Sequence, residues 1–168
     1  MSTSIRRDRE IIQYLYRLAY DHETTLNNGA KICAAVQIKN QLISIGFNQG
    51  KTHPLQARFG RNADSIFLHA EISAIKNALN HIHADDLIGA TLFVARAKRN
   101  KARDWGLAKP CEGCTEAINF FGISTVNYTT DNRNEFMQWK VHKKPERNRE
   151  RLIADIIHPW TTWQKAIR

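Results

Sequence analysis

The stretch ATLFVARA, residues 90–97, decides the fold class of this 168-residue chain. It is a short apolar run with β-branched and aromatic residues, which is typical of a buried strand. Pro110 then opens a segment of helical spacing that runs to Phe121, and Gly122 is its expected C-terminal cap. The run ISTVNYTT at 123–130 predicts the next strand. A strand, a helix and a second strand in this order indicate a parallel, right-handed crossover in an α/β protein.

The segments before this unit extend the alternation of helices and strands. Apolar residues at helical spacing predict an amphipathic helix over 6–22, and two β-rich runs at 32–38 and 42–47 predict a hairpin. Residues 48–65 have no sustained period, so we expect a long loop there. A helix is expected over 66–78, capped by the serine that precedes it.

The C-terminal part of the chain gives a weaker pattern. We expect residues 1–130 to form one domain with an N-terminal helix, which suits the length of the chain. Residues 131–168 are expected to be a basic, tryptophan-containing extension packed on that same domain, with a short helix within 147–160 that stops near Pro159.

Composition and charge limit the classes of protein. An apolar content of 42% indicates a folded globular chain, and no run approaches the roughly 18 apolar residues that span a bilayer. The N-terminus lacks the apolar segment of a secretory signal, so we expect a cytoplasmic protein without a membrane partner. A net charge of +9 would attract polyanions or phosphorylated small molecules, although a solvated basic face explains it equally.

Three side chains at the starts of two expected helices have the composition of a metal site. Cys111 and Cys114 form a C-x-x-C pair, and His69 begins the other helix. A catalytic zinc takes three such ligands and leaves the fourth position for water. A helix N-terminus also favours thiolates. Glu71 lies close by in sequence and is not needed as a ligand, which is the position that a proton shuttle requires.

The C-x-x-C pair alone has other interpretations. A redox dithiol would give no reason for the neighbouring His69 and Glu71. A structural zinc site needs a further pair of ligands. Cys33 is the remaining cysteine, and it is expected to be buried in a strand. His81 and His83 are the nearby histidine pair that could supply such ligands. The two motifs together therefore favour the catalytic site.

The combination of H-A-E at 69–71 with P-C-E-G-C at 110–114 resembles zinc-dependent base deaminases. The chain is similar to the cytidine deaminase-like superfamily, most closely to its deoxycytidylate (dCMP) deaminase branch, over residues 31–130. GFNQG at 46–50, GATLFV at 89–94 and GISTVNY at 122–128 also match, in the order of that family.

This resemblance implies an α/β fold with three layers, α/β/α, and a mixed five-stranded sheet. It makes His69, Cys111 and Cys114 the ligands of one catalytic Zn²⁺ ion. The implied reaction is a hydrolytic deamination, in which Glu71 passes protons from water to the ring nitrogen and to the leaving ammonia. The superfamily usually assembles, so a homo-oligomer is expected.

Three further positions correspond to substrate contacts in the family. Asn48 matches an asparagine that holds the sugar hydroxyl, although an asparagine that only ends a strand would look the same. The backbone around Ala70 and the carbonyl of Lys109 are expected to contact the amide-like edge of the base.

The chain departs from the family's glycine-proline pattern in the segment before His69. That segment carries basic groups, which we expect to hold a substrate phosphate by charge-assisted hydrogen bonds. They are Lys51, His53, Arg58 and Arg61.

The sequence therefore favours a deaminase of dCMP or a related pyrimidine nucleotide. An alternative is a deaminase that edits tRNA adenosine or single-stranded cytosine, with Trp139, Trp160 and Trp163 stacking on bases. Tryptophans at this spacing also fit a terminal helix packed on the core, so a nucleic-acid partner is the weaker expectation. A purine deaminase and a zinc-stabilised binding module remain further alternatives.

Overall fold

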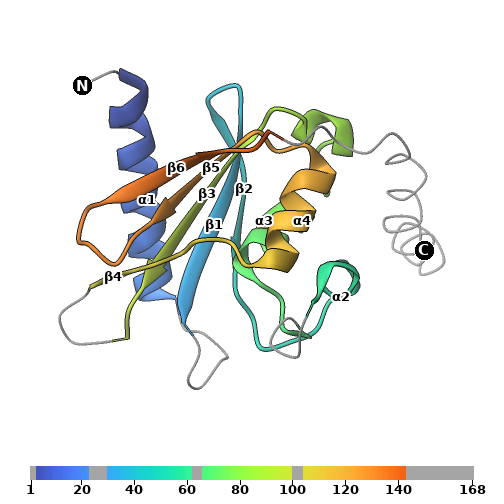
Figure 1. Ribbon diagram of the computed structural model, residues 1–168, viewed down its shortest axis with the longest axis horizontal. Helices are drawn as coiled ribbons and strands as arrows, with labels where there is room; N and C mark the ends of the chain where they lie inside the picture. The colour runs from blue at the N-terminus through green and yellow to red at the C-terminus, as the bar shows by residue number, and fades with distance from the viewer. Residues whose placement is uncertain (1–2, 23–29, 62–65, 100–103, 143–168) are drawn as a thin grey trace.

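The computed structural model describes residues 3–22, 30–61, 66–99 and 104–142. Helices and strands alternate along the chain, as the sequence predicts (Figure 1). The elements are α1 (Thr3–Asp21), β1 (Lys31–Ile38), β2 (Gln41–Phe47), α2 (Pro54–Phe59), α3 (Ala70–Ala78), the 3-10 helix η2 (Ala84–Leu87), β3 (Thr91–Ala97), β4 (Trp105–Gly106), α4 (Glu112–Phe121), β5 (Thr125–Thr129) and β6 (Phe136–Lys140).

The strands form one mixed sheet in the order β2-β1-β3-β5-β6. Strands β3 and β5 are parallel, which confirms the crossover predicted from residues 90–130. The other neighbours in this order are antiparallel. The two-residue strand β4 adds a short antiparallel pair to the end of β3. Five ordered strands with flanking helices confirm the expected fold class.

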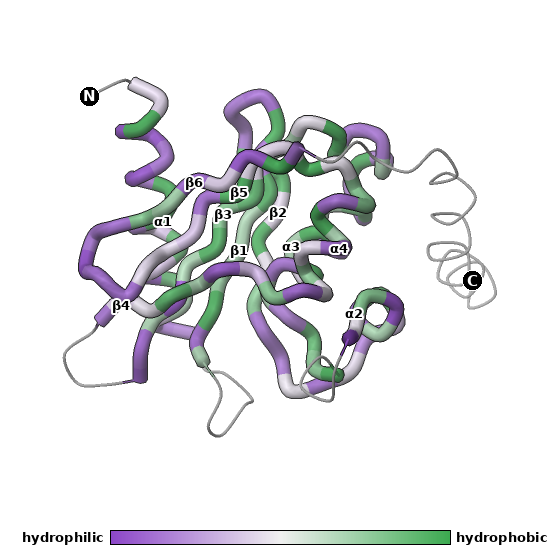
Figure 2. The backbone as a smooth tube through the Cα atoms, in the orientation of Figure 1, coloured by the Kyte–Doolittle hydropathy of each residue, from purple (hydrophilic) through white to green (hydrophobic). Residues whose placement is uncertain are grey.

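Helices cover both faces of the sheet, with α1 on one side and α3 and α4 on the other (Figure 1). Alternate residues of a strand point to opposite faces, so β1 and β3 supply both cores. In β1, Ala34 and Val36 belong to the core beneath α3 and α4, whereas Cys33 and Ala35 belong to the core beneath α1. Figure 2 shows the resulting hydrophobic colour along these central strands and the hydrophilic turn between β1 and β2.

The hairpin of β1 and β2 is confirmed. Its turn residues Lys39 and Asn40 both have positive φ, 46° and 67°. Two consecutive left-handed residues are the mark of the type I′ turn, whose twist matches that of the strands it joins. The hairpin fixes the direction of β2 and hence the point at which the chain leaves toward α3.

Two expectations for residues 48–78 are wrong. The segment expected to be a loop contains α2, which His53 caps by accepting a hydrogen bond from the Leu55 backbone N–H at 3.1 Å. The following helix begins at Ala70 instead of residue 66. Leu68 is held in an extended bridge with Gln49, and this pairing prevents a helix from starting earlier.

Two strands were not predicted. β4 lies between the strand expected at 90–97 and the helix expected from Pro110, where no strand was expected, and β6 lies beyond residue 130. β6 is an edge strand with little burial, so its residues lack the apolar alternation that would mark it in a sequence. Trp139 therefore lies in a strand and packs against the core beneath α3 and α4, not in a terminal helix. Trp160, Trp163 and the helix expected at 147–160 lie outside the described residues.

Candidate zinc site

The topology brings the starts of α3 and α4 to one edge of the sheet. Strands β2 and β3 are both antiparallel to β1, so they run in the same direction. α3 follows β2 and α4 follows β3, and both helices therefore begin at the carboxyl ends of these strands. The chain before α4 is fixed there by the Ala108 N–H, which donates to the carbonyl of Thr129 at the end of β5. Ligands of open α/β sheets bind at this edge.

His69 and Cys111 are the N-cap residues of α3 and α4, and neither side chain forms a cap hydrogen bond with its own helix. The two side chains instead approach each other. The His69 Nδ1 atom lies 3.5 Å from the Cys111 sulfur and 3.4 Å from the Cys114 sulfur. The ligand atoms of all three residues lie within 4.8 Å of one another.

This donor set fits zinc. Tetrahedral coordination with ordinary Zn–N and Zn–S bonds places the nitrogen and each sulfur about 3.5 Å apart. The two distances from His69 are close to that value. One imidazole and two thiolates leave a fourth position for water, and zinc held there would supply Lewis-acid activation of that water. His69, Cys111 and Cys114 thus form a zinc-binding cluster, as the sequence predicts.

The two thiols have different environments. The hydrogen bond from the Cys114 thiol, together with His69, lowers the pKa of Cys111 to about 4. The same hydrogen bond and burial raise the pKa of Cys114. Cys33, by contrast, is buried among apolar residues, and burial raises its pKa to about 12. Cys33 is therefore an inert core residue.

Glu71 lies in the first turn of α3 and is only 5% exposed. Burial raises the pKa of its carboxyl group, which adjoins the Cys114 sulfur. Burying an ionised carboxyl group costs free energy unless the group is paired or hydrogen-bonded. Glu71 lies beside the ligand cluster and is not one of the cluster's three members.

Asn48, Ala70 and Lys109 occupy different surroundings. Both polar atoms of the Asn48 side chain bond to the start of β1, because Oδ1 accepts from Ile32 N–H at 2.9 Å and Nδ2 donates to the Ala30 carbonyl at 2.6 Å. Ala70 is fully buried behind His69, and Lys109 is exposed two residues before Cys111. In the chain, Ala70 follows His69 directly and Lys109 precedes Cys111 by two residues. The Asn48 side chain joins the end of β2 to the start of β1.

Two of the four basic groups expected at the substrate phosphate have partners on α4. Arg61 forms an ion pair with Glu116, and the Arg58 guanidinium lies 5.9 Å from the ring centre of Phe120.

The other two basic groups, Lys51 and His53, have backbone or side-chain hydrogen bonds near His69 and at the start of α2. The Lys51 carbonyl accepts a hydrogen bond from Leu68 N–H at 2.9 Å, directly before His69. Burial, followed by the charges of Lys76 and Lys51, lowers the pKa of His53. His53 accepts the capping hydrogen bond from Leu55 N–H through Nδ1, and Lys51 is exposed.

Gln56, on α2, is a residue of this site that the sequence did not reveal. Its side chain is fully buried, and its Oε1 accepts a hydrogen bond from the backbone N–H of His69 at 3.0 Å. A lone glutamine in a basic segment has no metal-ligand pattern, so only the fold shows this contact.

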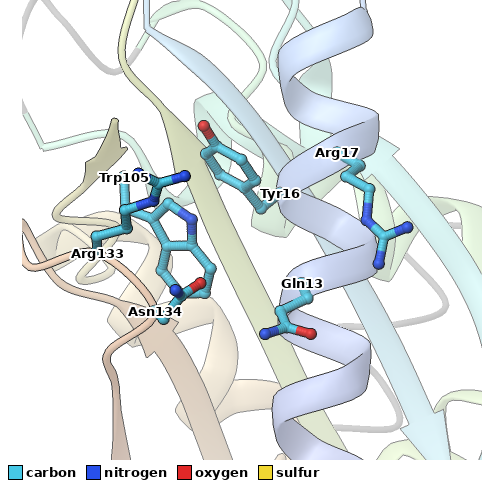
Figure 3. A pocket seen from close by; sticks show the side chains of 6 residues that line it. All are labelled: Gln13, Tyr16, Arg17, Trp105, Arg133 and Asn134. Carbon is cyan, nitrogen blue, oxygen red and sulfur yellow. The ribbon is translucent and has the colours of Figure 1, made fainter. Parts of the chain in front are cut away.

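A separate cavity of about 210 Å³ lies on the α1 face of the sheet. Figure 3 shows that one wall comes from α1 and the other from β4 and the turn before β6. Its lining residues are Gln13, Tyr16, Arg17, Trp105, Arg133 and Asn134. It is smaller than most ligand pockets, and Tyr16 and Trp105 stack on each other at 5.2 Å. Because it lies across the sheet from His69, it is not the substrate pocket of the zinc site.

The α/β fold and the ligand cluster define a zinc site with three protein ligands. Residues 6–130 match the family described as the cytidine and deoxycytidylate deaminase zinc-binding region. The chain belongs to this family, and it is a zinc-dependent deaminase of the cytidine deaminase-like superfamily. The search of curated protein sequences gave no significant match.

One solved structure supports the fold, and two others resemble this chain more loosely. A cytidine deaminase from Burkholderia pseudomallei is 14% identical and has a TM-score of 0.53, with 78% of this chain and 91% of that chain covered. A dCMP deaminase from the cyanophage S-TIM5 is 18% identical, with a TM-score of 0.49 and coverage of 80% and 89%. RibD from Acinetobacter baumannii is 19% identical, with a TM-score of 0.47 over 76% of this chain. The matched region is only 29% of the RibD chain.

Within the described ranges, each helix is too short or too polar to cross a bilayer.

Proposed function

We propose that this protein removes the amine of dCMP or a related pyrimidine nucleotide by hydrolysis. The observation that carries the proposal is the buried carboxyl of Glu71, which lies against the Cys114 sulfur beside a three-ligand zinc cluster. A purely structural zinc site would gain nothing from such a carboxyl. It has the position of a group that accepts a proton from water and delivers it to the leaving amine.

Basic groups on the segment before α3 support a phosphorylated substrate. Lys51 and Lys76 both lie close enough to His53 to lower its pKa. Lys51 and Lys76 thus add positive charge to the neighbourhood of His53, and a phosphate there would receive charge-assisted hydrogen bonds. Lys51 is joined through its backbone to Leu68, next to the metal ligand His69. This neighbourhood favours a nucleotide over a free nucleoside.

A substrate screen on the zinc-loaded protein tests this proposal. Ammonia release would be measured with dCMP, CMP, deoxycytidine, the corresponding di- and triphosphates, adenine and guanine nucleotides, and single-stranded oligonucleotides. We expect the monophosphates of cytosine to have the highest kcat/KM. Turnover confined to purine nucleotides or to oligonucleotides would contradict the proposed substrate class and leave the zinc chemistry intact.

The substitution Lys51→Ala should raise KM for dCMP by about tenfold, because a hydrogen bond to a charged group is lost at an exposed position. The kinetic constants for deoxycytidine, which has no phosphate, should stay the same. Lys39→Asn removes the same charge from the β1–β2 turn, where the positive φ of 46° suits asparagine. An equal KM change in Lys39→Asn would show that only net charge matters.

A further inference from the structure

Helix α2 lies between β2 and α3 and contacts both halves of the zinc cluster. It is only six residues long, and its start is fixed by the His53 cap and by Pro54 in the first turn. Leu55, Gln56 and Phe59 are buried, so one side of this short helix is packed into the protein. A helix of this length is not stable by itself, and its position is set by the elements it touches.

The contact with the histidine half is a single hydrogen bond. The Gln56 side chain is fully buried, and its Oε1 accepts from the backbone N–H of His69 at 3.0 Å. This N–H lies at the N-cap of α3, where the helix itself provides no acceptor. Because only the amide oxygen can accept a hydrogen bond, the orientation of the Gln56 amide is fixed. The bond thereby holds the backbone of His69, from which the ligand side chain extends.

The contact with the cysteine half is a close backbone approach. Gly113 lies between Cys111 and Cys114, and a Cβ atom added to it would lie 2.2 Å from the carbonyl oxygen of Phe59. Only glycine permits the end of α2 to come this close to the first turn of α4. The Phe59 ring also packs against Phe120 at 5.5 Å.

We propose that α2 is a brace that fixes the spacing of the two halves of the zinc cluster, and that Gln56 is a positioning residue for His69. Gln56 acts through the backbone of a ligand, much as outer-shell hydrogen-bond partners orient metal ligands elsewhere. Loss of such partners typically weakens metal binding by about 10–100-fold. The inference depends on the zinc cluster and is independent of which amine the protein removes.

The test compares zinc affinity in Gln56→Met and in the parent protein. Methionine has a similar volume and no strong acceptor, so the hydrogen bond to His69 is lost while the core stays filled. We expect the dissociation constant for zinc, measured by competition with a chromogenic chelator, to rise by about 10–100-fold. The spectrum of the cobalt-substituted protein should broaden, because the geometry at His69 is no longer unique. Gln56→Glu, which keeps an acceptor oxygen, should bind zinc more tightly than Gln56→Met.

Two further variants separate positioning from general stability. Leu15→Ala removes a buried side chain from the core beneath α1, across the sheet from the cluster. It should lower the melting temperature of the metal-free protein and leave zinc affinity unchanged. Gly113→Ala should weaken zinc binding even though alanine is the better helix former, because its Cβ displaces Phe59.

Unchanged zinc affinity in both Gln56→Met and Gly113→Ala would overturn the proposal that α2 fixes the spacing of the zinc ligands. An equal loss of affinity in Leu15→Ala would also overturn it. None of these readouts depends on the substrate, so a wrong substrate assignment would leave the result standing.

Discussion

Replacement of Glu71 by glutamine is expected to lower kcat by about 10²–10⁴-fold, which is the usual contribution of a positioned acid–base group. Glutamine has the same shape but cannot accept a proton and return it. Glu71 is buried at the start of α3, so the amide fills the same space and leaves the packing of the helix intact.

Zinc content separates this loss from a collapse of the site. The three ligands are His69, Cys111 and Cys114, and Glu71 is not among them, so Glu71→Gln should retain one zinc per chain. Glu112→Gln is the matched control, because Glu112 is an exposed carboxylate in the first turn of the other helix. Its activity should equal that of the parent. A Glu71→Gln protein that keeps more than about a tenth of the parent activity would exclude the proton-transfer role.

The largest effect on stability is expected at Gly46 in β2. A Cβ atom on Gly46 would lie 2.2 Å from the backbone nitrogen of Ala74, and 2.6 Å and 2.8 Å from backbone atoms of Ser73 and Ala70. All three contacts are with the backbone of α3, which cannot rotate away as a side chain can. Gly46→Ala should therefore lower the free energy of unfolding by about 1–3 kcal/mol, and Gly46→Val by more.

The same substitution should also disturb the metal site, because α3 carries His69 at its start. Chemical denaturation and zinc titration on each variant measure the two effects. Gly106→Ala is the control, since a Cβ there meets only the flexible side chain of Arg96. Equal destabilisation of Gly46→Ala and Gly106→Ala would show that strand glycines in general, and not the approach of α3, set the cost.

The zinc cluster could be predicted from the sequence because its residues lie in two short motifs. His69 and Glu71 are two residues apart, and Cys111 and Cys114 are three apart, so local spacing identifies them. The strands at 90–97 and 123–130 were predictable for a related reason. Both strands are largely buried, and they are rich in apolar, β-branched and aromatic residues, which are typical of strands.

The segment around α2 could not be predicted because its structure depends on distant partners. Nothing local makes residues 54–59 helical except the cap at their start, and the helix ends against Gly113 and Phe120 of α4. The basic residues there suggested a phosphate site. Arg61 has an ion-pair partner in Glu116, 55 positions away in sequence, and no local pattern predicts that pair.

The sequence by itself determined the chemistry of this protein and its fold class, since ligand identity, helix starts and strand hydrophobicity are local properties of the chain. The tertiary structure decided how the two motifs meet. The common direction of β2 and β3 places both helix starts at one sheet edge. α2 then contacts His69 through Gln56 and approaches α4 at Gly113. Those contacts join residues more than ten positions apart, and no local pattern encodes a distance between them.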